Sequence, residues 1–136
     1  MRWTAVSLAT ALVCATVNQA VAQKKVALVI GNDEYAHQTP LQNPGRDAQL
    51  IGATLQKIGF KLVENRALIN LDKVTTDKMV RAFAIMAQDA EIALFYFSGH
   101  GMQVSGKNYL VPIDLENFSP ATVDFQTLNA DLVLAR

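Results

Sequence analysis

Residues 92–101 read Ile-Ala-Leu-Phe-Tyr-Phe-Ser-Gly-His-Gly and join a hydrophobic run to a turn that contains a histidine. The run from Ile92 to Phe97 is the most hydrophobic segment after the N-terminal region, and it predicts a buried, central strand. His100 stands between Gly99 and Gly101, which permit unusual backbone angles and the close approach of a ligand. An imidazole at this place can serve as a general base near neutral pH. The alternative is a turn histidine without a catalytic role.

A second continuous apolar run, from Val26 to Ile30, ends at Gly31-Asn32-Asp33 and predicts another fully buried strand. A helix is expected next, with Asn43 as its N-cap, Pro44 at its first position and Gly59 in the left-handed conformation after its end. The remaining elements expected are a short edge strand at 61–65, a helix from Thr76 to Gln88, an extended piece from Asn108 to Val111 and helical sequence from Leu128 to Leu134.

The order strand, helix, strand, helix, strand predicts an α/β sandwich of three layers with right-handed crossovers and a mainly parallel sheet. The two most apolar strands belong near the centre and the mixed strand at 61–65 at an edge, which gives the strand order 2-1-3. Ligands of such sheets bind where the carboxyl ends of the strands flank the switch in strand order. This rule predicts a site between Asn32 and Asp33 on one side and Ser98 to Gly101 on the other.

Residues 1–22 have the features of a cleaved signal peptide, because Arg2 precedes an apolar stretch that ends in Ala20-Val21-Ala22, a small-x-small pattern. The protein is therefore expected to be exported, either to the periplasm or out of the cell. The alternative is a retained membrane anchor, although the stretch is shorter than the ~20 apolar residues that a span needs. Cys14 is the sole cysteine, and the bulky Val13 before it argues against a lipoprotein signal.

Acidic and basic residues balance, with 12 of each, so that neither nucleic acid nor an anionic surface is implied as a partner. His37 and His100 are the two histidines, and no cysteine follows the N-terminal segment, so a zinc site is not expected. Ser98 does not match a hydrolase nucleophile, because Tyr96 stands where the G-x-S-x-G turn needs glycine. Residues 31–34 match neither the dinucleotide-binding pattern nor the P-loop.

Several short motifs follow one another over residues 25–114, and their order and spacing are more specific than any one of them. The motifs are Val26 to Asn32 with Tyr35, Pro40-Leu41, Asn43-Pro44 with Asp47-Ala48, Leu55 with Gly59-Phe60, Phe95 to Gln103, and Gly106 to Asp114. Together they resemble the caspase and metacaspase cysteine peptidases (peptidase family C14), particularly the bacterial, exported members. Residues 24–136 are accordingly expected to form the N-terminal part of a caspase-like (p20-type) domain.

This resemblance implies roles for four residues. His100 matches the catalytic histidine, and the backbone N–H of Gly101 matches a donor of the oxyanion hole, which stabilises charge on the scissile carbonyl. Ser98 and Asp47 match positions that line the primary specificity pocket of metacaspases, where a buried carboxylate would pair with a substrate Arg or Lys. The alternative for Asp47 is a carboxylate in the first turn of a helix, which the helix dipole favours.

The sequence departs from the pattern of the family at three places. Animal caspases select aspartate with arginine, and their first pocket arginine falls near Leu41 here, with Arg46 as the neighbouring cation to be excluded. The nucleophilic cysteine of the family follows a further strand, which is expected beyond Arg136. The segment Met102 to Ile113 contains no carboxylate, so the acidic stretch that contributes to calcium binding in metacaspases is not matched. No cofactor is expected, and calcium is left as an alternative that this segment does not support.

The leading hypothesis is a cysteine endopeptidase that cleaves peptide or protein substrates after Arg or Lys, with the 136-residue chain itself inactive because it lacks the thiolate. The alternative is a non-catalytic caspase-like module that binds peptides or partner proteins. An Asp-x-Cys or similar cysteine turn after the next strand would support the enzyme. A membrane is expected as a partner only if the N-terminal segment is retained, and the sequence does not assign an oligomeric state.

Overall fold

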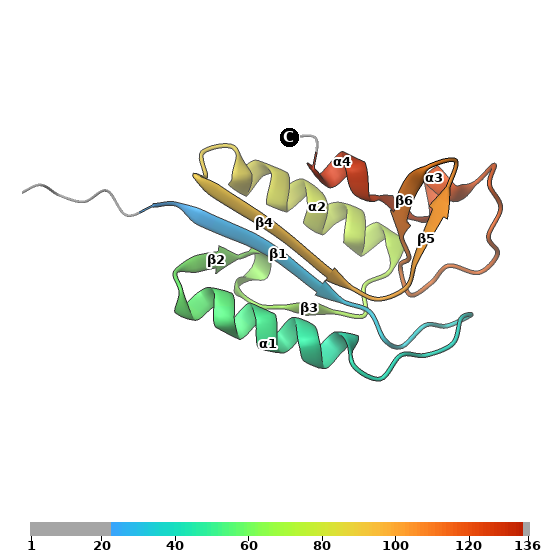
Figure 1. Ribbon diagram of the computed structural model, residues 1–136, viewed down its shortest axis with the longest axis horizontal. Helices are drawn as coiled ribbons and strands as arrows, with labels where there is room; N and C mark the ends of the chain where they lie inside the picture. The colour runs from blue at the N-terminus through green and yellow to red at the C-terminus, as the bar shows by residue number, and fades with distance from the viewer. Residues whose placement is uncertain (1–22, 135–136) are drawn as a thin grey trace, which may run out of the picture.

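The structure is a computed structural model that describes residues 23–134, with side chains up to residue 133. The signal peptide expected at residues 1–22 lies outside the described residues. Figure 1 shows a twisted sheet between helices, with a smaller sheet beyond one end of it. The elements are β1 (Lys25–Gly31), α1 (Pro44–Lys57), β2 (Phe60–Leu62), the 3₁₀ turn η1 (Val63–Asn65), β3 (Leu68–Ile69), α2 (Lys73–Ala87), β4 (Ile92–Ser98), β5 (Gly101–Val104), β6 (Lys107–Leu110), α3 (Val123–Gln126), β7 (Leu128–Asn129) and α4 (Ala130–Leu134).

Strand β1 forms the centre of the four-stranded sheet, and every position after Lys25 in it is buried. β2 and then β3 pair with one side of β1, both in parallel. β4 pairs in parallel along the whole of the other side, from Lys25 opposite Ile92 to Gly31 opposite Ser98. This arrangement confirms the predicted order 2-1-3 and brings the carboxyl ends of β1 and β4 to the same edge of the sheet.

Two hydrophobic cores hold the helices against opposite faces of the sheet, because alternate side chains of a strand point to opposite faces. Val26, Leu28 and Ile30 pack in the core under α2, whereas Ala27 and Val29 pack in the core under α1. Each fully buried aliphatic side chain contributes roughly 1.5–3 kcal/mol. Figure 1 shows α1 and α2 on opposite sides of β1 and β4, which confirms the three-layer sandwich.

The prediction of a strand at 61–65 is wrong beyond Leu62, where β2 ends. The chain leaves the extended conformation there, because Glu64 and Asn65 adopt φ values of 55° and 56°. Positive φ is uncommon for residues other than glycine, and the composition of residues 61–65 does not indicate it. The second edge element is therefore split into β2 and β3, which pair with different halves of β1.

Strand β4 was expected to be central, but it lies at an edge of the sheet that the described residues form. Within that sheet it pairs with β1 alone. Its side chains are exposed or half-buried, and Ile92 is 41% exposed. Both faces of β4 still pack against a core, with Phe95 and Phe97 on the α2 side and Leu94 and Tyr96 on the α1 side.

Helix α1 begins at Pro44 after Asn43, as predicted, but the Asn43 side chain makes no capping hydrogen bond. The carboxylate of Asp33, from the loop after β1, accepts the bond from the Gly45 N–H instead, at 3.1 Å. Gly59 follows the helix with φ of 92°, which confirms the left-handed position. The cap of α1 is thus tertiary, and it ties the start of the helix to the end of β1.

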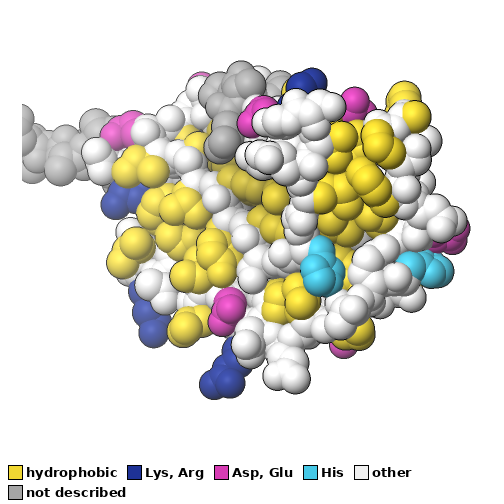
Figure 2. Space-filling model, turned by 45° about the vertical axis from the view of Figure 1, so that its right-hand side comes forward, with side chains coloured by type: hydrophobic (Ala, Val, Ile, Leu, Met, Phe, Trp, Pro, Cys, Tyr) yellow, Lys and Arg dark blue, Asp and Glu magenta, His cyan; other side chains and the backbone are white. Residues whose placement is uncertain are grey.

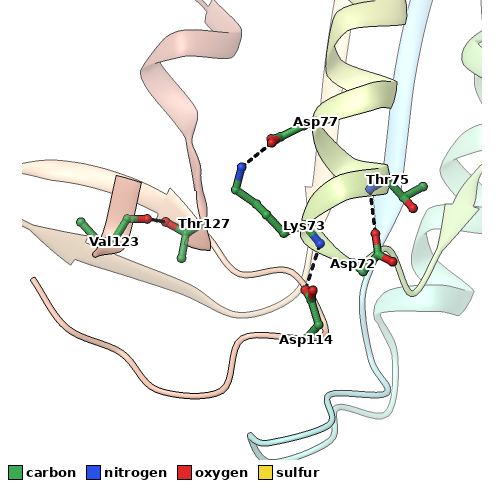
Figure 3. A network of polar contacts seen from close by, with 7 residues as sticks. All are labelled: Asp72, Lys73, Thr75, Asp77, Asp114, Val123 and Thr127. Carbon is green, nitrogen blue, oxygen red and sulfur yellow. Dashed lines mark hydrogen bonds and ion pairs between the residues drawn. The ribbon is translucent and has the colours of Figure 1, made fainter. Parts of the chain in front are cut away.

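Helix α2 begins at Lys73 rather than at the predicted Thr76. Asp72 is its N-cap, and its carboxylate accepts a hydrogen bond from the Thr75 N–H at 2.7 Å (Figure 3). The Lys73 N–H, which has no acceptor within the helix because it lies in the first turn, donates to the Asp114 carboxylate at 2.9 Å. Two carboxylates from separate segments, Asp72 and Asp114, therefore accept hydrogen bonds from N–H groups in the first turn of α2.

The chain after β4 forms a three-stranded antiparallel sheet in the order β5-β6-β7. Ser105 and Gly106, with φ of 49° and 79°, form the tight turn between β5 and β6, so the expected extended piece near 108–111 is one arm of a hairpin. The expected helical segment at 128–134 is divided into β7 and the short helix α4. Within residues 23–134, no helix has the length and apolar character required to cross a membrane.

The two capping positions give a matched test of the fold. Asp72→Ala should lower the free energy of unfolding by about 1 kcal/mol, because it removes a capping acceptor, whereas Asn43→Ala should change it by less than about 0.5 kcal/mol. The Thr75 hydrogen bonds lower the pKa of Asp72 below its usual 3.8. The stabilisation is therefore present above that value and is lost as the pH falls through the lowered pKa. Urea unfolding at neutral and acidic pH measures the effect of each variant and its pH dependence. Equal losses of unfolding free energy in the two variants would contradict the assignment of Asp72, rather than Asn43, as a capping side chain.

Candidate functional site

The site at the carboxyl edge of the sheet is built on the buried side chain of Asn32, the residue after β1. Asn32 is 0% exposed. Its carboxamide oxygen accepts from the Leu71 N–H at 2.9 Å, and its nitrogen donates to the Val111 carbonyl at 3.2 Å and to the Leu71 carbonyl at 3.4 Å. Its backbone N–H donates to the Ser98 carbonyl at 2.9 Å. One residue thus fixes the ends of β1, β4 and β6 and the loop before α2.

The hydroxyl of Tyr35 links the loop after β1 to the histidine turn. It accepts a hydrogen bond from the His100 backbone N–H at 2.7 Å and donates to the Val111 carbonyl at 3.3 Å. The Val111 N–H donates directly to the His100 carbonyl at 3.0 Å. The Tyr35 side chain is buried, and this burial raises the pKa of Tyr35 above its usual 10.0. The hydroxyl is therefore a neutral donor and acceptor at neutral pH.

The imidazole of His100 is held by a backbone carbonyl and an aromatic ring. Its Nε2 lies 2.7 Å from the Thr39 carbonyl oxygen. Because a carbonyl only accepts, Nε2 carries the proton, and Nδ1 of the neutral ring is left with a free lone pair. The ring centroids of Tyr35 and His100 are 4.5 Å apart, with the planes tilted by 53°. Figure 2 shows the two histidines of the chain at the surface of one face.

The two glycines beside His100 differ in the space that their surroundings leave for a side chain. A Cβ at Gly99 would lie 2.5 Å from the Tyr35 hydroxyl and 2.9 Å from the Phe97 ring, so the position has no room for a side chain. A Cβ at Gly101 would meet nothing closer than 3.5 Å. Neither glycine has positive φ, so the expected unusual backbone angles are not found. The group that approaches Gly99 closely is Tyr35 of the chain itself, and the close approach of a ligand stays a prediction.

The backbone N–H of Gly101 is directed away from its partner strand. Hydrogen-bonded and non-hydrogen-bonded pairs alternate along an antiparallel ladder. The Val111 N–H bonds to the His100 carbonyl, so the next pair, Gly101 with Leu110, is of the non-hydrogen-bonded kind. The Gly101 N–H therefore points outward from the sheet edge next to the imidazole turn, where it can donate to another group.

Comparison with known proteins places the sequence in a family. A family model described as "Caspase domain" matches residues 24–135. The chain belongs to the caspase domain family. It is similar to the human "Mucosa-associated lymphoid tissue lymphoma translocation protein 1", with 31% identity over 102 residues, and to its mouse homologue, with 31% over 99 residues. These alignments cover 75% and 73% of this chain but 12% of each relative, so the chain spans about an eighth of their length.

Membership of the caspase domain family gives a frame for the pocket residues predicted from the sequence. Asp47 lies in the first turn of α1 and its side chain is exposed, rather than buried as a finished pocket would require. Ala48, the next residue, packs against Gly31, which stands opposite Ser98 in the sheet. Asp47 and Ser98 therefore belong to the same edge of the sheet, while no hydrogen bond or ion pair joins them among the described residues.

A neighbouring cation, an apolar cavity and the possible metal ligands also bear on the extent of this site. Arg46, the cation to be excluded from the pocket, is exposed beside Asp47. An apolar cavity of about 120 Å³ opens between α2, α4 and the first half of β4, where Ala93 and Phe95 line it. His100 follows the opposite end of β4, so this cavity is not the site of the chemistry. The described residues contain no cluster of three or more His, Cys, Asp or Glu side chains that could hold a metal ion.

Sequence reasoning missed the partners that orient His100. Tyr35 was noted only as part of a motif, although an aromatic residue in an otherwise polar loop is a signal for a buried anchor. Thr39 acts through its backbone carbonyl, which any residue could supply, so its side chain gives no signal. Val111 likewise contributes its main chain, as the acceptor shared by Asn32 and Tyr35.

The contact between Gly99 and Tyr35 predicts non-additive effects on stability. Gly99→Ala should destabilise the fold by about 1–3 kcal/mol through overpacking, whereas Gly101→Ala, with room for its methyl group, should cost less. In a Tyr35→Phe background the cost of Gly99→Ala should shrink by about 0.5 kcal/mol or more, because the hydroxyl that it strikes is gone. A double-mutant cycle in urea measures this coupling. Additive losses would show that Tyr35 does not set the requirement for glycine.

Proposed function

We propose that this chain is the histidine-bearing part of a cysteine endopeptidase that cleaves after Arg or Lys. The observation that carries the proposal is the hydrogen bond from His100 Nε2 to the Thr39 carbonyl, at 2.7 Å. This bond leaves Nδ1 as the base of the neutral ring. A caspase-family peptidase needs such a base to activate its thiol, because the thiolate is the nucleophile.

In the proposed reaction, His100 Nδ1 takes the proton of a cysteine thiol. The sulfur then attacks the scissile carbonyl carbon, and the electron pair of the C=O bond moves to oxygen. The Thr39 carbonyl faces the imidazolium that results and favours its charge. When the intermediate collapses, the C–N bond breaks, the amine leaves with the proton from Nδ1, and water later hydrolyses the thioester with His100 as base again.

Gly101 would stabilise the oxyanion of the intermediate. Its N–H is directed away from β6 and follows the His100 peptide directly. A fixed backbone donor of this kind needs no reorganisation when charge develops, and losing one donor in comparable sites costs roughly 2.7–4 kcal/mol. The proximity of base and donor supports acyl transfer over a purely binding role for this edge.

Asp47 and Ser98 would line the pocket for the basic side chain of the substrate. The carboxylate of Asp47 is exposed and can reach a bound cation, while Ser98 lies at the end of β4. A substrate Arg or Lys that is enclosed there would form a charge-assisted hydrogen bond with Asp47. The pocket would be completed by segments that also supply the nucleophile, since Cys14 lies in the predicted signal peptide.

The test uses the full-length protein with its nucleophilic cysteine. Asp47→Ala should lower kcat/KM for Arg and Lys peptides about 30-fold or more, because truncating one partner of a buried charge pair costs roughly 2–5 kcal/mol. His100→Ala should abolish turnover of all substrates, since the base is gone. Fluorogenic peptides that end in Arg, Lys or Asp provide the measurement.

Two controls separate the roles. Glu91→Ala removes an exposed carboxylate next to the amino end of β4 and should leave the specificity unchanged. His37→Ala removes the other histidine, whose partner is Glu116, and should leave turnover intact. If Asp47→Ala keeps the preference for Arg over Asp within a few-fold, Asp47 is a helix-end carboxylate only. If the full-length protein lacks a cysteine after its next strand, the peptide-binding module is the better description.

A further inference from the structure

We infer that Tyr35 is a positioning residue for His100, whose hydroxyl acts as a spacer between the histidine turn and β6 and thereby keeps the imidazole on the Thr39 carbonyl. This inference rests on the proposed function, because it concerns the base of that reaction. Tyr35 itself is buried, and its hydroxyl bonds only to backbone groups of His100 and Val111 among the described residues. Its influence would pass through the backbone of His100.

The hydroxyl occupies a place that a strand hydrogen bond would otherwise take. His100 and Val111 continue the β5-β6 register, as a pair that should exchange two direct backbone bonds. One of these bonds exists, from the Val111 N–H to the His100 carbonyl at 3.0 Å. The other is replaced by the Tyr35 hydroxyl, which bonds the His100 N–H at 2.7 Å and the Val111 carbonyl at 3.3 Å. The ladder is therefore held open by one oxygen atom at the catalytic residue.

His100 is fixed from several directions at once. The hydroxyl of Tyr35 holds its N–H, Val111 holds its carbonyl, Thr39 holds Nε2, and the Tyr35 ring lies beside the imidazole at 4.5 Å. If the oxygen were absent, the His100 N–H could close on the Val111 carbonyl directly. That closure would shift the His100 turn toward β6 and change the position of the imidazole relative to the Thr39 carbonyl.

The close fit around the hydroxyl supports a spacer. A Cβ built on Gly99 would lie only 2.5 Å from the hydroxyl oxygen, so the turn passes directly against it. The Val111 carbonyl is already shared with the buried Asn32 amide, which fixes the acceptor in place. The oxygen thus lies between the Val111 carbonyl, which is held in place, and the His100 N–H of the turn.

The test is Tyr35→Phe in the full-length protein, which keeps the ring and removes the oxygen. kcat should fall by about tenfold or more, because a shift of about 1 Å in a catalytic group can cost up to 10² in rate. KM should change by less than about twofold, since the residue makes no substrate contact. The rate at which iodoacetamide alkylates the catalytic cysteine should fall in parallel, because it reports how well His100 draws the thiol proton.

Asp72→Ala is the matched control, because it destabilises the fold through the cap of α2 without touching the histidine turn. It should leave kcat and the alkylation rate at wild-type values when the protein is folded, as shown by circular dichroism at the assay temperature. If Tyr35→Phe behaves like Asp72→Ala, Tyr35 is structural only and the inference fails. If His100→Ala leaves turnover intact, the proposed function fails instead. If Tyr35→Phe does not fold, Gly99→Ala, which pushes on the same oxygen, must reproduce the loss in kcat for the inference to stand.

Discussion

The carboxamide of Asn32 is the constraint on which the carboxyl edge of this domain depends. It is fully buried, and both its oxygen and its nitrogen are hydrogen-bonded to main-chain groups of Leu71 and Val111. A buried amide without partners costs several kcal/mol, whereas a fully satisfied one specifies a single arrangement. The segment before α2 and the end of β6 are therefore held in fixed positions against the ends of β1 and β4.

The position of the histidine follows from that arrangement. Val111, fixed by Asn32, accepts from Tyr35, and Tyr35 in turn accepts from the N–H of His100. Thr39, from the loop that Tyr35 anchors, then meets the imidazole. The orientation of the base thus depends on the loop after β1 and on the end of β6, joined by the side chains of Asn32 and Tyr35. This dependence on distant segments explains why a histidine between two glycines was ambiguous in isolation.

The sequence predicted the parts of the fold that local pattern determines. The apolar run at Val26–Ile30 and the helix between Pro44 and Gly59 were right because burial and helix-end signals act within a few residues. The break in the strand after Leu62 was not predicted, because the positive φ angles of Glu64 and Asn65 depend on tertiary contacts rather than on local sequence. The start of α2 was misplaced although Asp72, a good N-cap residue before Thr75, was there to be read. For the site, the motif resemblance supplied His100 and Gly101, while the contacts of Thr39 and Val111 run through backbone atoms that carry no residue-type signal.

His100 presents Nδ1 as a base because Nε2 is bonded to the Thr39 carbonyl. Nitrogen-15 NMR of histidine-labelled protein measures this tautomer, at a pH about two units above the ordinary histidine pKa of about 6.5, with the His100 signals identified by their loss in His100→Gln. We expect a protonated Nε2 and an unprotonated Nδ1. A ring protonated at Nδ1, or a rapidly exchanging mixture of both tautomers, would contradict this assignment.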